Sequence, residues 1–229
     1  MTPPAPFAPM PVVVLISGRG SNLLALLDAQ RRGRLPIRIA AVLSNRPDAQ
    51  GLHAARAAGV PIRVLVHRGF AGRAAFDAAL IEAIDEFQPE LILLAGFMRI
   101  LTPSFVAHYR GRLLNIHPSL LPDLPGLDTH QRALDAGRRE HGASVHFVTP
   151  QVDGGPVVAQ ARVPIQQGDT AQTLAERVLR QEHRLFPMVV DWFARGRLRL
   201  TEQGPTLDDA VLATPRMLDV DATPAWETA

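Results

Sequence analysis

The fold is decided by Val12-Val13-Val14-Leu15-Ile16-Ser17-Gly18-Arg19-Gly20-Ser21-Asn22, an apolar run that ends in a glycine-containing turn. An uninterrupted apolar run of this length is typical of a strand that is buried on both faces of a parallel sheet. The pattern that follows, at residues 21–32, predicts an α-helix. A strand, a short turn and a helix in this order begin a β-α-β unit.

The alternation of strands and helices continues along most of the chain. Further strands are predicted at residues 37–43, 62–66, 91–95 and 113–116, and helices at residues 49–58, 72–87 and 103–108. Two more strands, at 143–148 and 157–163, are joined through the turn Asp153-Gly154-Gly155-Pro156, and residues 170–194 predict a long amphipathic helix. The predicted fold class is α/β, a doubly wound, mostly parallel sheet with an antiparallel addition near the C-terminal part.

The chain is organised around one predicted domain. Its 229 residues, 47% of them hydrophobic, suit a single soluble domain without internal repeats. We expect the domain to span residues 12–200, after a Pro-rich extension at 1–11 and before a surface-lying or mobile tail at 201–229. The extension has no basic residue, and no apolar run approaches the ~20 residues of a membrane helix. We therefore expect a cytoplasmic location and no membrane partner.

The charge composition is unusual because all 24 cationic side chains are arginine. With neither lysine nor cysteine, and with Tyr109 as the single tyrosine, almost no group loses charge between about pH 8 and 11. A net charge of +2 is thus compatible with a pI near 10.2, which gives no support for a nucleic-acid partner. The missing residues also exclude Schiff-base lysines, Walker A loops, thiolate nucleophiles, disulfides and cysteine-ligated metals.

The turn after the first predicted strand has the features of a phosphate site. Gly20, Ser21 and Asn22 open the helix, where backbone N–H groups and the positive helix end favour an anion. Leu23 occupies the place of the third glycine of a dinucleotide fingerprint, so one phosphate monoester fits better than a pyrophosphate. The alternative is a structural turn in which Ser21 or Asn22 caps the helix.

A second candidate ligand site follows the strand at residues 91–95. Open parallel sheets bind ligands at the carboxyl ends of their strands, and Met98, Arg99, Ile100 and Leu101 stand at this edge. The alternative is that these apolar side chains belong to the core. Thr102-Pro103 predicts the start of the next helix.

The most informative polar residues lie at the end of the strand at residues 113–116. Asn115 and His117 are two residues apart, so both point to the same face of an extended strand. If Asp153 folds back against His117, the imidazole becomes easier to protonate. A carboxamide donor beside an imidazolium then suits an oxygen that gains negative charge, as in acyl transfer.

Other interpretations of these residues remain open at this point. His117 could be a buried histidine that bonds a backbone carbonyl, and Asp153 could be a turn residue that bonds its own backbone. A serine hydrolase with Ser119 as nucleophile is disfavoured, because Ser119 lies outside a G-x-S-x-G elbow and only two residues from its base. No metal site is expected, since the remaining histidines show no paired ligand spacing: His53, His67, His108, His130, His141, His146 and His183.

Four blocks of sequence carry a resemblance to a known family. They are residues 13–23, 95–101, 114–122 and 142–156, which include Ser17-Gly18, Ala95-Gly96-Phe97-Met98-Arg99-Ile100-Leu101, Leu114-Asn115-Ile116-His117-Pro118 and Asp153-Gly154-Gly155-Pro156. In order and spacing the chain resembles the phosphoribosylglycinamide formyltransferase family of purine biosynthesis, over about residues 12–200. The resemblance implies a Rossmann-like formyltransferase fold. It also implies transfer of a formyl group from the co-substrate 10-formyltetrahydrofolate to the amine of glycinamide ribonucleotide, without a metal.

The resemblance also implies roles for individual residues. The family's catalytic trio is matched by Asn115, His117 and Asp153. Its binding site for the substrate's phosphate is matched by Gly20, Ser21 and Asn22, and a further substrate contact is matched by Glu182. Its folate site is matched by Arg73, Met98, Arg99, Ile100, Leu101 and Asn115. The chain departs from the family pattern in its Pro-rich extension and in Asp128, where a histidine is expected.

Two related folate enzymes and one non-enzyme are the alternatives. Methionyl-tRNA formyltransferase resembles this chain but carries an extra C-terminal domain, for which the stretch after Leu200 is too short. Formyltetrahydrofolate deformylase has an N-terminal regulatory domain and a second histidine where this chain has Pro118. A non-catalytic mononucleotide-binding module would keep the phosphate loop but would not need Asn115, His117 and Asp153 together.

Overall fold

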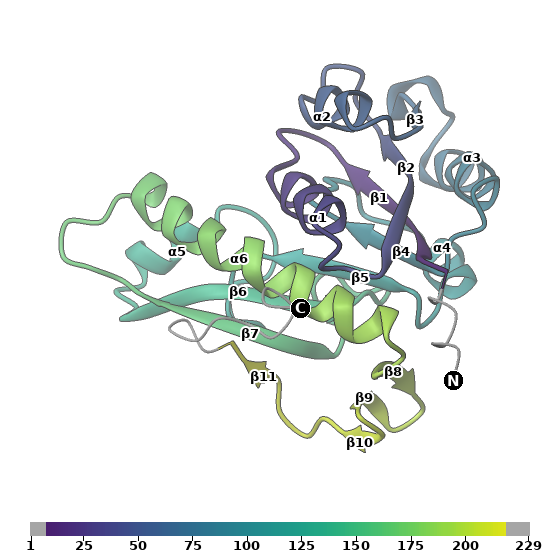
Figure 1. The fold of residues 1–229 in the computed structure, drawn as a ribbon. Helices are drawn as coiled ribbons and strands as arrows, with labels where there is room; N and C mark the ends of the chain where they lie inside the picture. Colours follow the sequence, from purple (N-terminus) through teal and green to yellow (C-terminus); the bar gives the residue numbers. More distant parts are fainter. Residues whose placement is uncertain (1–7, 219–229) are drawn as a thin grey trace.

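The computed structural model describes residues 8–218, and within them the main sheet has eight strands in the order β11-β7-β6-β5-β4-β1-β2-β3 (Figure 1). Residues 1–7 of the predicted extension and 219–229 of the predicted tail lie outside the described residues. The strands of this sheet are β1 Met10–Ile16, β2 Ile37–Ser44, β3 Ile62–Val64, β4 Leu91–Leu94, β5 Leu113–His117, β6 Glu140–Phe147, β7 Val157–Pro164 and β11 Arg216–Met217. The helices are α1 Ser21–Arg31, α2 Gly51–Ala57, the 3-10 helix η1 His67–Gly69, α3 Arg73–Asp85, α4 Pro103–His108, α5 Thr129–Asp135 and α6 Ala171–Ala194.

Strand β1 lies between β4 and β2 and is buried on both faces, as its unbroken apolar run predicts. Val12 and Val14 pack in one core cluster with residues of α1, α2 and α6. Val13 and Leu15, which point the opposite way, pack in a second cluster with residues of α3 and α4. Helices therefore cover both faces of the sheet, and the predicted doubly wound α/β class is confirmed.

The antiparallel addition is also confirmed, because β6 runs antiparallel to both of its neighbours, β5 and β7. The pairs β5·β4, β4·β1, β1·β2 and β2·β3 are parallel. Since β6 returns along β5, it places its own side chains directly opposite the end of the strand that carries Asn115 and His117. This arrangement brings two distant parts of the sequence to one site.

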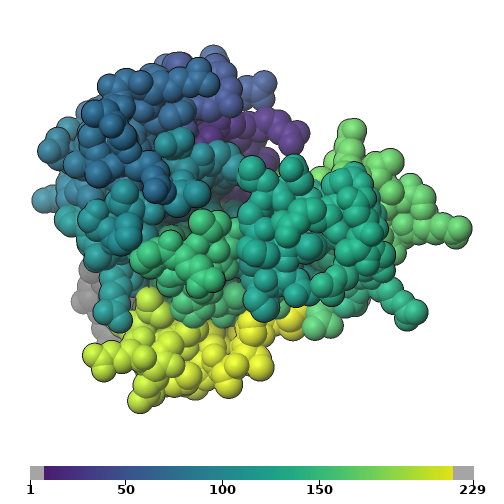
Figure 2. Space-filling view, turned by 180° about the vertical axis from the view of Figure 1, so that it is seen from behind, coloured from purple at the N-terminus to yellow at the C-terminus, as the bar shows by residue number. Residues whose placement is uncertain are grey.

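Several short elements have no counterpart among the predictions. Helix α5 has only about two turns, too few for a clear helical period. A second sheet, β10-β9-β8, consists of β8 Leu198–Thr201, β9 Gly204–Leu207 and β10 Ala210–Val211, and β11 adds to the edge of β7. Part of the stretch interpreted as a tail is thus ordered against the domain, and Figure 2 shows these C-terminal residues in yellow along one side of the molecule.

Capping residues set the starts of two helices, and the first of these starts, at Thr102-Pro103, was expected from the sequence. The Thr102 hydroxyl accepts a hydrogen bond from Phe105 N at 3.3 Å, with Pro103 in the first turn of α4. Thr170 and Thr173 cap α6 reciprocally. Among residues 8–218, no helix combines the length and apolar character needed to span a membrane.

Candidate active site

Three neighbouring strands, β1, β4 and β5, end at the same edge of the sheet. The turn after β1 carries the predicted phosphate loop, the loop after β4 carries Met98 and Ile100, and β5 itself carries Asn115 and His117. Because the carboxyl ends of parallel strands form the ligand edge of an open sheet, these segments surround one site. The three stretches singled out in the sequence are therefore brought together.

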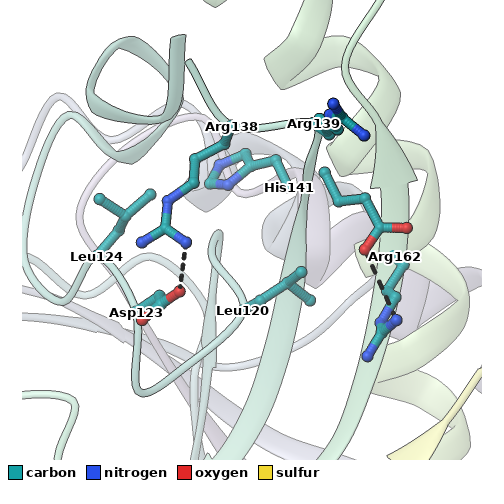
Figure 3. Close-up of a pocket in the computed structure, with 8 residues that line it drawn as sticks. Leu120, Asp123, Leu124, Arg138, Arg139, His141 and Arg162 are labelled. Atoms are coloured by element: carbon teal, nitrogen blue, oxygen red, sulfur yellow. Dashed lines mark ion pairs between the residues drawn. The ribbon is translucent and has the colours of Figure 1, made fainter. Parts of the chain in front are cut away.

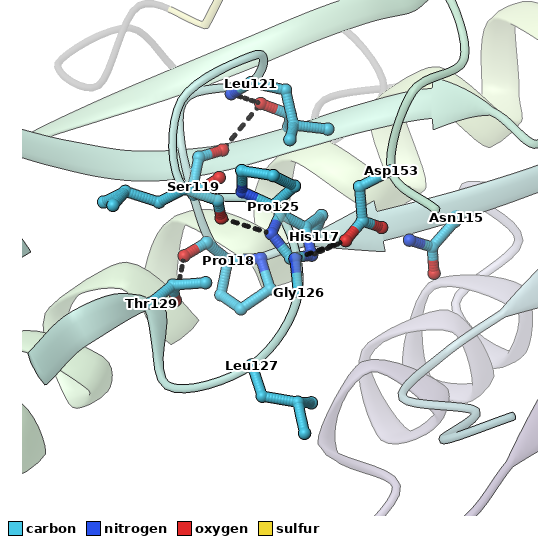
Figure 4. Close-up of polar contacts among 12 residues, drawn as sticks. Asn115, His117, Pro118, Ser119, Leu121, Pro125, Gly126, Leu127, Thr129 and Asp153 are labelled. Carbon is cyan, nitrogen blue, oxygen red and sulfur yellow. Dashed lines mark hydrogen bonds and ion pairs between the residues drawn. The ribbon is translucent and has the colours of Figure 1, made fainter. Parts of the chain in front are cut away.

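The predicted trio meets at the end of β5, where Asp153 folds back toward the sheet (Figure 4). His117 Nδ1 lies 3.4 Å from Asp153 Oδ2, and both side chains are nearly buried, with 7% and 11% of their surface exposed. The other ring nitrogen, Nε2, lies 3.1 Å from the carbonyl oxygen of Leu124. Both nitrogens thus face oxygen atoms, an arrangement that satisfies the ring fully once it is protonated.

The turn between β6 and β7 fixes the position of Asp153. Asp153 adopts a left-handed backbone conformation, and its Oδ2 accepts a hydrogen bond from Gly126 N at 2.8 Å. A Cβ at Gly155 would lie 1.8 Å from the carbonyl oxygen of Phe147, so only glycine fits there. Glycine at position 155 is thus required in the turn that brings the carboxylate to the site.

The electrostatics of His117 differ from the sequence-based expectation. Burial lowers the pKa of His117 below its usual value of 6.5; the Leu124 carbonyl and Asp153 act in the raising direction but do not outweigh it. For Asp153, burial acts to raise the pKa, but the nearby His146 ring, the hydrogen bond from Gly126 N and the nearby His117 lower it on balance. The resting site therefore favours a neutral imidazole beside an ionised carboxylate.

The phosphate loop lies against two other segments of the chain. Gly20 has φ 74°, and a Cβ there would lie 2.7 Å from the Cα of Gly51 at the start of α2. Asn22 Nδ2 donates to Glu182 Oε2 at 2.7 Å, which joins α1 to α6 across 160 residues of sequence. Glu182 is buried, and burial raises its pKa. The predicted substrate contacts thus form one cluster, with Ser21 beside them in the first turn of α1.

The predicted folate residues divide into exposed and buried side chains. Met98 and Ile100 are 61% and 54% exposed, whereas Leu101 is buried. The Arg99 guanidinium lies 5.9 Å from the centre of the Phe76 ring on α3. Arg73 is exposed on the same helix, one turn before Phe76. Exposed apolar side chains beside two arginines match an anionic ligand with a flat apolar part.

A family model described as formyl transferase matches residues 10–190 of this chain. The chain belongs to the formyl transferase family. Phosphoribosylglycinamide formyltransferase of Escherichia coli is 53% identical over 199 residues, which cover 87% of this chain and 94% of that protein. The human trifunctional purine biosynthetic protein adenosine-3 is 45% identical over 193 residues, 84% of this chain and 19% of that protein.

Solved structures give the same result. The phosphoribosylglycinamide formyltransferase of Coxiella burnetii in complex with CHES superposes with a TM-score of 0.89 at 49% identity and covers 92% of this chain and 100% of that chain. The glycinamide ribonucleotide transformylase 1 of Symbiobacterium toebii has a TM-score of 0.85 at 44% identity, over 88% of this chain and 95% of that chain. The Rossmann-like formyltransferase fold implied by the sequence is thus confirmed.

One residue of this formyl transferase site, His146, was not singled out in the sequence. It lies directly opposite Asn115 in the β5·β6 register, and its Nε2 is 3.0 Å from Asn115 Nδ2. Its Nδ1 lies 2.9 Å from the carbonyl of Phe147, which assigns the ring proton to Nδ1 and leaves Nε2 to accept from Asn115. His146 therefore orients the Asn115 carboxamide and leaves its second amide hydrogen free for a ligand. Only the β5·β6 register reveals this role.

The loop after β5 in the formyl transferase also forms one wall of a cavity of about 540 Å³ (Figure 3). Leu120, Asp123 and Leu124 line it from the loop, and Asp123 pairs at 3.1 Å with Arg138 before β6. Both partners of this pair are about half exposed, so its contribution to stability is at most about 1 kcal/mol. Within the described residues, no group of three or more His, Cys, Asp or Glu side chains is placed to hold a metal ion.

Proposed function

We propose that this chain transfers the formyl group of 10-formyltetrahydrofolate to the amine of glycinamide ribonucleotide in purine biosynthesis, by direct attack. The observation that carries the proposal is the end of β5, where Asn115, His117 and Asp153 meet at the same sheet edge as the phosphate loop and the exposed Met98 and Ile100. The names of relatives that match nearly their full length support the same reaction.

The first chemical step needs a donor for a developing oxyanion. The substrate amine attacks the formyl carbon, a new C–N bond forms, and the electron pair of the C=O bond moves to oxygen. Asn115 has one amide hydrogen free, because the other is directed at His146. Removing one such donor typically costs about 3 to 4 kcal/mol of barrier stabilisation.

The second step moves one proton from the attacking nitrogen to the departing folate nitrogen. His117 is neutral at rest because burial lowers its pKa, so it accepts the proton that the attacking amine releases. Asp153 then stabilises the imidazolium, which also supports the neighbouring oxyanion. The proton passes on to the folate nitrogen as its bond to the formyl carbon breaks, leaving the formyl amide and tetrahydrofolate without a covalent enzyme intermediate.

His117 must change one contact before it can reach the substrate. Its Nε2 faces the Leu124 carbonyl and its Nδ1 faces Asp153. Since Asp153 is needed to stabilise the imidazolium, the Leu124 contact is the one that is exchanged for substrate or a bridging water. The loop at residues 119–129 therefore takes part in the catalytic cycle.

The decisive assay mixes the protein with glycinamide ribonucleotide and 10-formyltetrahydrofolate and measures both products, with a parallel reaction that omits the amine. Formyl transfer that requires the amine supports the proposal. Formate release without the amine would assign the protein as a deformylase instead. If neither reaction occurs, the result supports the alternative of a non-catalytic mononucleotide-binding module. A cytoplasmic location is part of the same proposal and follows from the pathway.

A further inference from the structure

A row of polar side chains crosses the antiparallel part of the sheet beside the trio. His117 lies opposite Ser144 in the β5·β6 register, and Ser144 lies opposite Gln160 in the β6·β7 register. Directly opposed residues of antiparallel strands point to the same face. The imidazole, the hydroxyl and the carboxamide therefore stand side by side under the loop that follows β5.

Ser144 and Gln160 hold that loop by its backbone, at Ser119 and Leu121, which are labelled in Figure 4. The Ser144 hydroxyl donates to the carbonyl of Ser119 at 2.6 Å and accepts from Leu121 N at 3.0 Å. Gln160 Nε2 donates to the carbonyl of Leu121 at 2.8 Å and to the Ser144 hydroxyl at 2.9 Å. The hydroxyl thus uses its one donor and both acceptor positions, and the amide uses both hydrogens.

The cluster is buried, which makes these bonds hard to replace. Ser119 and Ser144 have no exposed surface, and Gln160 is 9% exposed. Removing one partner would leave backbone groups of the loop unpaired away from water, a change that favours a different loop position. The loop near residue 121 is thus held in one place from β6 and β7.

The same bonds lead on to the catalytic imidazole. The Ser119 hydroxyl donates to the carbonyl of Asp123 at 2.6 Å, and the next carbonyl along the chain, that of Leu124, faces His117 Nε2 at 3.1 Å. The position of the Leu124 carbonyl therefore depends on bonds that start at Gln160. Two strands away from His117, the carboxamide influences how the ring is oriented.

We propose that Gln160 and Ser144 are positioning residues for His117, which act by fixing the loop backbone from Ser119 to Leu124. The proposal rests on the proposed formyl transfer for its kinetic consequences, but its structural part is independent of the substrate. Displacement of a reacting group by about 1 Å commonly costs about 100-fold in rate. We therefore expect kcat to fall by about 10- to 100-fold when the cluster is disrupted, with little change in KM for either substrate.

The test replaces Gln160 by methionine, which has a similar length but no hydrogen-bonding amide. The backbone bond from Leu218 N to the Gln160 carbonyl does not involve the side chain, so the pairing of β11 is kept. Gln172→Met is the matched control, because Gln172 is exposed on α6 and bonds only its neighbour Glu176. Ser144→Ala serves as the second variant if Gln160→Met does not fold.

The direct readout is the ¹⁵N NMR spectrum of the His117 ring, assigned by its absence in His117→Gln. In the wild type and in Gln172→Met we expect the same signals, those of a neutral ring in a single tautomer. In Gln160→Met and Ser144→Ala we expect the ring signals to shift toward a mixture of tautomers while kcat falls. Unchanged His117 signals in a folded Gln160→Met protein would overturn the proposal, whatever its kcat, and so would shifted signals with a wild-type kcat. A wild type that does not transfer formyl groups would refute the proposed function, while the spectra would still test the positioning.

Discussion

The sharpest test of the trio is Asp153→Asn, which removes one charge and almost no volume. Asp153 is placed to stabilise His117 only after the ring gains a proton, because its Oδ2 lies 3.4 Å from Nδ1. Two unit charges at that distance attract by roughly 5 kcal/mol at an effective dielectric constant of about 20. The asparagine side chain still offers a carbonyl dipole, so we expect about 2 to 4 kcal/mol of this stabilisation to be lost.

That loss corresponds to a fall in kcat of roughly 30- to 1,000-fold, at about 1.4 kcal/mol per factor of ten. The variant should fold, since the new carboxamide can still accept the hydrogen bond that Gly126 N donates to the carboxylate at 2.8 Å. The assay is formyl transfer measured between about pH 5 and 8. Activity depends on neutral His117, so kcat/KM should rise with pH through the His117 pKa and then level off.

The direction of the pH shift distinguishes this reasoning from a loss of folding. Asp153 acts to raise the His117 pKa, so its neutralisation should move the acid limb of the profile to lower pH. Asp208→Asn is the matched control: it neutralises an aspartate after β9 whose ion pair with Arg197 is about half exposed, and it should change kcat little. A near-normal kcat for Asp153→Asn, or an acid limb that moves to higher pH, would refute the assignment.

Four further perturbations test other parts of the site and of the fold. Asn115→Ala should lower kcat by roughly 100- to 1,000-fold, because it removes the free oxyanion donor, with normal thermal unfolding as the control measurement. Glu182→Ala should raise KM for glycinamide ribonucleotide by about tenfold and leave the KM for folate unchanged, since it leaves Asn22 Nδ2 without its acceptor; the opposite pattern would place Glu182 elsewhere in the reaction. Met98→Ser should raise the KM for folate by about tenfold, because an exposed apolar side chain that the ligand would cover is lost. The contribution of His141 to stability should fall by roughly 3 kcal/mol between pH 6.5 and pH 4, because burial lowers the pKa of His141 from 6.5 to about 4 and the unfolded chain binds the proton first. Urea unfolding of His141→Gln should show a weaker pH dependence, and an equal one would exclude His141 as the source.

Strands β1 to β7 of the main sheet could be predicted because each of them is encoded locally. The apolar run Val12–Ile16 and the pair Asn115 and His117 follow from the period of a strand and need no knowledge of the rest of the chain. Thr102-Pro103 marks a helix start for equally local reasons. The same logic fails for α5 and for the strands after Leu198, which are too short to show a period.

The remaining features depend on contacts between distant segments. His146 and Ser144 become important only through the register of β6 against β5, which the turn and the core determine together. The net shift of the His117 pKa has the opposite sign from the expected one, because burial by other segments outweighs a carboxylate correctly expected nearby. Sequence spacing indicated which groups meet, but it contained no measure of how much water they lose.

The reversed direction of β6 explains why two kinds of function lie next to each other. Running back along β5, it sets His146 opposite Asn115 and Ser144 opposite His117. A parallel strand would need a long crossover and would align its neighbours in the other sense. In the proposed mechanism, the first pair orients the group that meets the oxyanion, and the second holds the loop whose Leu124 carbonyl releases the ring. In this mechanism β6 therefore supports both a donor that stays fixed, the Asn115 amide, and a contact that is exchanged, the one between His117 and the Leu124 carbonyl. Substitutions in β6 should for this reason lower kcat more than they change the KM for either substrate.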